Sequence, residues 1–191
     1  MISGIVLAAG MASRFGSTKQ IVEIDGKPLV QHAVDVAAAA ELDEIVVVLG
    51  HDAERVREAL RLPENGRVVL NQRFAEGQST SLASGLRALH PESDAAVVLL
   101  SDQLGVQPEE IQALIGRFGE TQASILRLRY RNAPGPALLS KAIWPEALGL
   151  MGDIGARALF ERQPVENVTV SRQVPADVDR VEDIRSETDD E

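Results

Sequence analysis

The feature that most constrains the fold of this chain is a regular alternation between short apolar runs and longer segments with helical spacing. The apolar runs have the length of buried strands, and they end at glycine or polar residues. They lie at residues 5–8, 44–49, 68–70, 95–100, 123–130 and 168–170, and helical spacing follows at 28–40, after Asp52, around Leu82, Leu86 and Leu89, and after Pro108. This alternation predicts an α/β three-layer sandwich with a mostly parallel sheet, in which the very apolar run at 95–100 is central.

Composition limits the classes of protein that the chain can represent. Its 191 residues and 45% hydrophobic content suit one globular domain, expected over residues 1–185, with an acidic, frayed tail at 186–191. The formal net charge of -10 argues against broad nucleic-acid binding, and the absence of cysteine excludes disulfides, thiolate metal sites and a cysteine nucleophile. No run reaches the ~18 apolar residues of a membrane span, so we expect a cytoplasmic protein that does not bind a membrane.

The first apolar run leads directly into a loop rich in glycine, hydroxyl and cationic side chains. In open α/β sheets, ligands bind at the carboxyl ends of the strands. Glycines let backbone N–H groups approach an anion, and hydroxyls and cations add donors and charge. The loop residues of these types are Gly10, Ser13, Arg14, Gly16, Ser17, Thr18 and Lys19. We expect a polyphosphate here; the alternative is a polar connection that binds nothing.

This loop differs from the commoner phosphate-binding motifs. Five residues separate Gly10 from Gly16 and the lysine comes two residues late, so the GxxxxGK[ST] pattern fails. The GxGxxG fingerprint of dinucleotide-binding proteins is absent as well. Residues 78–82 do not form the G-x-S-x-G elbow of a serine hydrolase, and His51 has no partner at the spacing of a metal site.

The stretch from Leu7 to Gln20 resembles the signature LAAGxSxRxGxxKQ of the MobA-like nucleotidyltransferases, and most closely the branch that cytidylylates molybdopterin. The matching residues are Leu7, Ala8, Ala9, Gly10, Ser13, Arg14, Gly16, Lys19 and Gln20, without a gap. The resemblance implies a Rossmann-like sheet of the nucleotide-diphospho-sugar transferase type. It also implies that the loop binds the triphosphate of a nucleotide, with Arg14 and Lys19 as catalytic cations on its phosphates.

A second segment, from Asn71 to Leu86, is similar to the part of the family that lies against the base and sugar. The residues carried over as nucleotide-binding are Asn71, Gly77, Ser79 and Ser81. A purely structural role is the alternative, because a hydroxyl of Ser79 or Thr80 would also cap the helix that follows.

Asp102 follows the central apolar run, at the position where a Mg²⁺ ligand would face the phosphate loop. The surrounding residues resemble the family pattern D-Q-P-x-V, with Leu104 in place of the proline. A segment similar to D-I-D-T-P-E-D implies Asp179 as a second metal ligand, preferred to Asp177. Each aspartate could instead serve as a helix cap or turn residue.

Two later segments resemble the acceptor side of the family's site. Gly135 and Pro136 lie in a segment similar to G-x-P-G-H-P-x-x-F, from which the histidine is missing. Asp153 and Arg157 lie in a segment similar to G-D-x-G-A-R, and here the alternative is a helix start with Asp153 as its cap.

Taken with these residues, the resemblance implies Mg²⁺-dependent transfer of CMP from CTP to a phosphorylated acceptor, molybdopterin, with release of pyrophosphate and a transient molybdoenzyme partner. The guanylyl branch has a glycine at the position of Ala9, and a purine needs more room than a pyrimidine, so CTP is expected over GTP. Two alternatives stay open. One is a guanylyl or sugar-phosphate nucleotidyltransferase of the same fold, and the other is a non-catalytic nucleotide-binding accessory protein for a molybdoenzyme.

Overall fold

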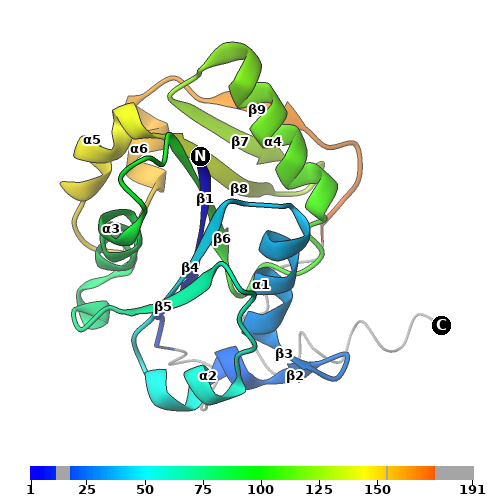
Figure 1. Ribbon diagram of the computed structural model, residues 1–191. Coiled ribbons are helices and arrows are strands. Elements are labelled where there is room, and N and C mark those ends of the chain that lie inside the picture. Colours follow the sequence, from blue (N-terminus) through cyan, green and yellow to red (C-terminus); the bar gives the residue numbers. More distant parts are fainter. Residues whose placement is uncertain (12–17, 154, 175–191) are drawn as a thin grey trace.

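A seven-stranded sheet forms the centre of the computed structural model, which describes residues 1–11, 18–153 and 155–174 (Figure 1). Its strands are β1 (Ile2–Ala8), β4 (Glu44–Leu49), β5 (Gly66–Leu70), β6 (Ala95–Leu100), β7 (Ile125–Arg129), β8 (Pro134–Ser140) and β9 (Glu166–Thr169). The order is β5-β4-β1-β6-β8-β7-β9, which confirms that β6 is central. In the described part of the chain, only β8 pairs antiparallel with its neighbours in this sheet, so the sheet is mostly parallel as predicted.

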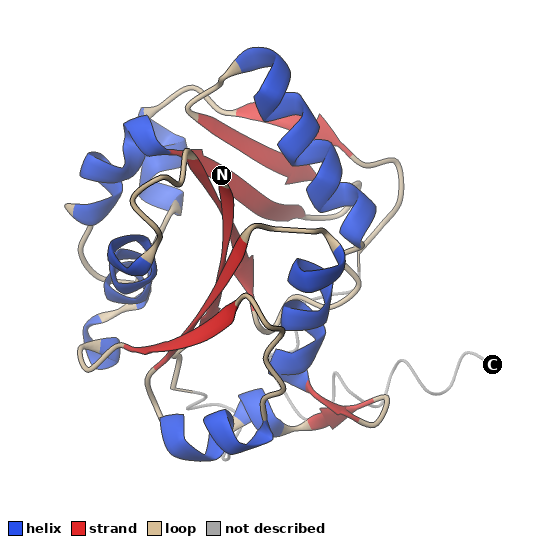
Figure 2. Ribbon diagram, in the orientation of Figure 1, coloured by secondary structure: helices blue, strands red, loops and turns tan. Residues whose placement is uncertain are grey.

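Helices cover both faces of this sheet, which confirms the three-layer sandwich (Figure 2). One face carries α1 (Leu29–Ala39), α2 (Ala53–Ala59) and α4 (Pro108–Thr121), and the other carries α3 (Gln78–Ala88), α5 (Trp144–Leu148) and α6 (Arg157–Arg162). The short elements are a hairpin of β2 (Glu23–Ile24) and β3 (Lys27–Pro28) and the 3₁₀ helices η1 (Lys19–Ile21), η2 (Phe74–Glu76) and η3 (Lys141–Ile143). None of the helices within the described ranges is long and apolar enough to cross a membrane.

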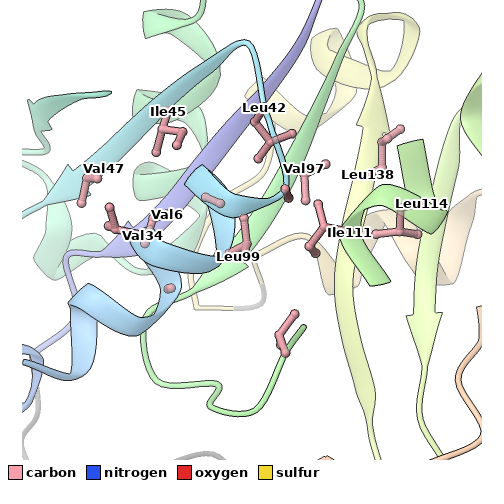
Figure 3. Packing of buried hydrophobic residues seen from close by; sticks show 14 of the residues in the cluster. Val6, Val34, Leu42, Ile45, Val47, Val97, Leu99, Ile111, Leu114 and Leu138 are labelled. Atoms are coloured by element: carbon pink, nitrogen blue, oxygen red, sulfur yellow. The ribbon is translucent and has the colours of Figure 1, made fainter. Parts of the chain in front are cut away.

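The core has two halves because successive side chains of each strand point to opposite faces of the sheet. In β1, Val6 packs towards α1 and α4, whereas Ile5 packs towards α3, and both are fully buried. Figure 3 shows the first half, where Ile111 and Leu114 of α4 lie over the sheet. Strands buried on both faces read as continuous apolar runs, which explains why residues 44–49 and 95–100 are recognised so cleanly in the sequence.

The structure corrects the sequence-based elements at three places. Strand β8 and helix α5 were not predicted, and helix α1 begins at Leu29 rather than at Pro28, which ends β3. Strand β8 was hidden because it starts with Pro134-Gly135-Pro136, and proline cannot donate to a ladder. The prolines fit because β6 pairs only with residues 137–140 of β8.

A buried carboxylate ties together four segments at the amino-terminal edge of the sheet. Glu44 Oε1 accepts hydrogen bonds from the hydroxyls of Ser3 at 2.7 Å and Ser93 at 3.0 Å, and one from the His90 N–H at 2.7 Å. Its Oε2 pairs with Arg67 at 2.7 Å, and only 7% of the Glu44 side chain is exposed. Burial alone would raise the pKa of Glu44, but the hydrogen bonds from His90 and Ser3 outweigh it, and with Arg67 they lower the pKa.

We predict that Glu44→Gln lowers the free energy of unfolding at pH 7 by about 2 kcal/mol, because hydrogen bonds to a buried charge are replaced by weaker ones. A carboxyl group with a lowered folded-state pKa stabilises the fold above its ordinary value of 4.5, and this contribution is lost as pH falls through the lower folded value. The difference between wild type and variant should therefore shrink in acid, as urea unfolding from pH 7 to pH 3 would show. Glu58→Gln, at an exposed position, is the control; a Glu44→Gln difference that stays constant over this range would contradict the account.

Candidate active site

The parallel pairing of β1 with β6 brings two predicted site segments together at the carboxyl edge of the sheet. Leu7 lies opposite Leu100 in this pairing, and just beyond it the Ser101 N–H donates to the Leu7 carbonyl at 3.1 Å. The glycine loop follows β1, and Asp102 follows Ser101. The segment that leads to Gly10 and the segment that leads to Asp102 therefore leave the sheet side by side, as the sequence predicted.

An ion pair joins these two segments across the edge. Lys19 Nζ lies 3.0 Å from Asp102 Oδ2, and the two side chains are 11% and 35% exposed. Lys19 starts η1, which brings the chain back from the loop to the sheet. One cation and one carboxylate are thus held side by side at the position predicted for a triphosphate and its metal ion.

Two hydrogen bonds to the backbone hold the first residues of the loop, and one of them comes from the side chain of Gln20, beyond the far end of the loop. Gln20 Nε2 donates to the Gly10 carbonyl at 2.9 Å, and the His51 N–H donates to the Ala9 carbonyl at 3.2 Å. Three predicted residues of the loop, Ser13, Arg14 and Gly16, lie outside the described residues, as does the predicted metal ligand Asp179.

A second anchor lies at Thr18, next to the far end of the loop. Its hydroxyl donates to the carboxylate of Asp52, which also accepts a hydrogen bond from Arg55 at 2.8 Å. Asp52 precedes α2 with φ at 53°, and its side chain makes no capping hydrogen bond. The carboxylate of Asp52 therefore holds the loop rather than the start of the helix.

The two small residues after β1 have different surroundings. Gly10 is exposed, and a Cβ added there would have no atom within 4 Å. Its φ is not positive, so neither the backbone conformation nor a close neighbour requires glycine here, and its contact with a phosphate stays a prediction. Ala9 is 3% exposed and packs in the core cluster with Leu7 and Val48. Its side chain therefore gives no support to the argument that an Ala9 methyl group limits the size of the base.

The polar residues of the second predicted segment fold mainly onto one another. Asn71 is 3% exposed; its side chain donates to Thr80 Oγ1 at 2.9 Å and Ser81 Oγ at 3.0 Å, and accepts from the Arg73 N–H at 2.9 Å. Asn71 thus shapes the connection from β5 to α3. Its contact with a nucleotide, like those of Ser79 and Ser81, stays a prediction.

The start of α3 differs from the predicted cap. Gly77 occupies the capping position, so neither Ser79 nor Thr80 does. Gly77 has φ at 114°, and a Cβ there would lie 2.3 Å from the Gly152 carbonyl carbon. The Ser79 N–H donates to the Gly152 carbonyl at 3.1 Å. The loop around Gly152 therefore packs on the start of α3, and this close approach requires glycine at position 77.

A cleft of about 640 Å³ opens beside β1 and β6 and contains all four predicted acceptor residues. Those four are Gly135, Pro136, Asp153 and Arg157, and the lining also includes Leu7, Gln78, Leu100, Gln103, Arg127, Phe160 and Glu161. The predicted capping role of Asp153 is wrong, because Ala156 precedes the first residue of α6. The structure thus collects the acceptor candidates from β8, α6 and the loop before α6 at one place.

Among the cleft residues that sequence reasoning did not single out are Gln103, Arg127 and Phe160. Gln103 follows Asp102 and donates from Nε2 to the Pro134 carbonyl at 3.2 Å. Arg127 occupies a polar position within the alternating run that became β7, and such a cation inside a sheet was the available signal.

The structure also shows the surroundings of Leu104 and Pro136, the two positions at which the sequence departs from the family pattern. Leu104, which replaces the proline, is 7% exposed and packs with Ile24 and Leu29, while Gly105 supplies a turn with φ at 74°. Pro136, which follows Gly135 where the family has histidine, lines both the large cleft and a second one of about 370 Å³ near α1. The loop after Asp102 is therefore buttressed by apolar packing instead of by a proline.

Comparisons with known proteins agree with this architecture. The family model described as MobA-like NTP transferase domain matches residues 4–168. Nicotine blue oxidoreductase of Paenarthrobacter nicotinovorans is 29% identical, over 95% of this chain and 93% of its own length. GlmU of Cellvibrio japonicus is 31% identical over 72% of this chain, which spans only 29% of that bifunctional protein.

Among solved structures, Rv0371c of Mycobacterium tuberculosis is 32% identical, with a TM-score of 0.86 and coverage of 97% of this chain and 96% of its own. A further structure of Rv0371c is a complex with manganese. The similarity extends over the whole sheet and its helices, and therefore includes the strands that carry the site.

We predict that one of two glycine substitutions lowers the free energy of unfolding and that the other leaves it nearly unchanged. Gly77→Ala should lower the free energy of unfolding by about 1–3 kcal/mol, because its Cβ would meet the Gly152 backbone and its φ is unfavourable for alanine. Gly10→Ala, where the Cβ meets nothing within 4 Å, should change stability by less than about 0.5 kcal/mol. Urea denaturation of both variants is the measurement, and equal stabilities would contradict the packing described here.

Proposed function

The chain belongs to the MobA-like NTP transferase family and is a nucleotidyltransferase, and we propose that it transfers CMP from CTP to a phosphorylated acceptor, molybdopterin, with release of pyrophosphate. This would be a step in the maturation of a molybdenum cofactor, with delivery to a molybdoenzyme as a transient partner. Because membership of the family indicates a transferase, the alternative of a non-catalytic accessory protein is not retained.

The observation that carries the proposal is the Lys19–Asp102 ion pair at the carboxyl edge of β1 and β6. In the proposed reaction, an oxygen of the acceptor phosphate forms a bond to the α-phosphorus of CTP. The bond from that phosphorus to the bridging oxygen breaks, and pyrophosphate leaves with the electron pair. Such a transfer needs positioning and neutralisation of charge rather than a protein nucleophile. In this proposal, Lys19 offsets the charge that develops on the leaving pyrophosphate, together with Arg14 of the same loop.

The residues present fit a Mg²⁺ ion. Asp102 offers a partly exposed carboxylate, and Mg²⁺ in such sites takes one or two carboxylates and completes its shell with phosphate oxygens and water. Within the described residues, no group of three or more histidine, aspartate or glutamate side chains lies close enough together to hold a metal ion. We propose that Asp102 holds the ion with Asp179. When bound, the ion would neutralise the phosphate oxygens, and the manganese complex of Rv0371c supports a divalent cation.

The choice of CTP and molybdopterin rests on the resemblance of the first loop rather than on a measured pocket. A second candidate keeps the chemistry and takes a sugar phosphate as acceptor. This candidate is compatible with the fold, which the chain shares, at a TM-score of 0.77, with a structure described as a putative glucose-1-phosphate thymidylyltransferase from Bacillus anthracis. The name of nicotine blue oxidoreductase, which this chain matches over nearly its whole length, indicates redox chemistry. This sequence, however, lacks the GxGxxG fingerprint of dinucleotide-binding folds.

The proposal is tested by pyrophosphate release from a panel of nucleoside triphosphates and acceptors with Mg²⁺. We expect release with CTP and molybdopterin, and at least about 10-fold lower kcat/KM with GTP, a preference of about 1.4 kcal/mol. Release with a sugar phosphate but not with molybdopterin would select the second candidate. Equal use of GTP and CTP would contradict the expected base, and oxidation of NADPH without pyrophosphate release would contradict nucleotidyl transfer.

We predict that Lys19→Ala and Asp102→Asn each lower kcat by about 100-fold or more, because each removes a charge that acts on the transferring phosphates. The fold should be retained in Asp102→Asn, since this side chain is partly exposed. Lys141→Ala is the matched control; its lysine lies at the amino-terminal edge of the sheet, near Pro91. Variants at 19 and 102 that turn over like wild type would remove the ion pair from the mechanism.

A further inference from the structure

The large cleft contains a cation, Arg127, for which residues 1–11, 18–153 and 155–174 offer no counterion. Arg127 projects from β7 into the cleft and is half-buried. Its guanidinium carbon lies 4.4 Å from the centre of the Phe160 ring, and its Nε donates to the Gly135 carbonyl at 3.4 Å. These two contacts fix the plane of the guanidinium and leave its two terminal nitrogens, which make no hydrogen bond or ion pair within the described residues.

The surroundings of Arg127 are unfavourable to a cation as long as the cleft holds no anion. Burial lowers the pKa of Arg127, and the like charges of Arg157 and Arg129 lower it further. The carboxylates that also line the cleft, Asp153 and Glu161, are exposed at its rim and form no ion pair with Arg127 in the described part of the chain. An anion in the cleft would relieve both the desolvation and the repulsion.

We propose that Arg127, held flat by Phe160, is the residue that selects a phosphomonoester as the acceptor, with Arg157 as a second cation at the rim. The paired terminal nitrogens of a guanidinium match two oxygens of a phosphate, which a lysine cannot do. This inference rests on the proposed function, because it names what recognises the acceptor in that reaction.

The position of Arg127 suits this role with respect to the reacting groups. The cleft is also lined by Leu100 and Gln103, which flank Asp102 in the chain. A phosphate bound to Arg127 would therefore lie in a cleft whose lining residues adjoin the proposed metal ligand in the chain.

Two matched variants test the proposal. Arg127→Gln removes the charge and the guanidinium fork but keeps most of the stem, whereas Arg129→Gln removes a charge from an exposed position of the same strand, outside the cleft. Phe160→Leu removes the ring and keeps an apolar side chain. Circular dichroism and thermal unfolding would establish that all three fold like wild type. If Arg127→Gln fails to fold, Arg127→Lys takes its place, because lysine keeps the charge and loses only the guanidinium fork.

The primary readout is calorimetric binding of inorganic phosphate to the full chain, with the nucleotide loop saturated by α,β-methylene CTP. We expect Arg127→Gln to weaken phosphate binding about 10- to 100-fold and Phe160→Leu to weaken it less, with Arg129→Gln unchanged. In turnover, Arg127→Gln should raise KM for the acceptor by a similar factor and leave KM for CTP unchanged. Equal phosphate affinity in wild type and Arg127→Gln, or equal losses in Arg127→Gln and Arg129→Gln, would overturn the proposal.

The two proposals can fail separately. If the CTP analogue does not bind and no pyrophosphate is released, the proposed function has failed, and phosphate binding is then compared between Arg127→Gln and Arg129→Gln in the nucleotide-free protein. If CTP binds and is turned over normally by Arg127→Gln at low acceptor concentration, the proposed function stands and the role of Arg127 is wrong.

Discussion

The site depends on the parallel pairing of β1 with β6 at the centre of the sheet. Because Leu7 and Leu100 lie opposite each other, the segments that follow them must leave the sheet side by side. One segment carries the glycine loop and the other carries Asp102, so the Lys19–Asp102 contact at 3.0 Å follows from strand register. Helices on both faces bury most of this pairing, and a buried face strongly specifies the register of its strands.

Sequence predicts the frame of this molecule better than its acceptor side. Strands buried on both faces are unmistakable, which is why the two strands that create the edge could be inferred from the apolar runs at residues 5–8 and 95–100. Strand β8 could not be inferred in this way, because prolines are unfavourable in a strand. Its opening prolines are tolerated because β6 does not pair with that part of β8. Polar residues such as Asn71 show a further limit: a sequence cannot tell whether an amide faces a ligand or folds into its own loop.

Arg127 shows a related limit, because its candidate role depends on residues that are distant from it in the sequence. Nothing in its local pattern resembles a motif, and it gains significance only when Phe160 and Gly135, distant in sequence, meet it in the cleft. The chain as a whole carries a net charge of -10, yet Arg127 and Arg157 line the cleft, and Lys19 lies beside Asp102 at the carboxyl edge of the sheet. A local concentration of cations in an acidic protein favours a small anionic substrate over a polyanion, and it does so where the strands end.

The central claim is that the chain transfers the α-phosphorus of a nucleotide to a phosphorylated acceptor. The most direct measurement follows the label from CTP that is radioactive at either its α- or its γ-phosphorus, in the presence of Mg²⁺ and molybdopterin. The account predicts that the α-label appears in a product that also contains the acceptor, while the γ-label appears only in pyrophosphate. Transfer of the γ-label to the acceptor, or an α-label found only in CTP and its hydrolysis products, would contradict it.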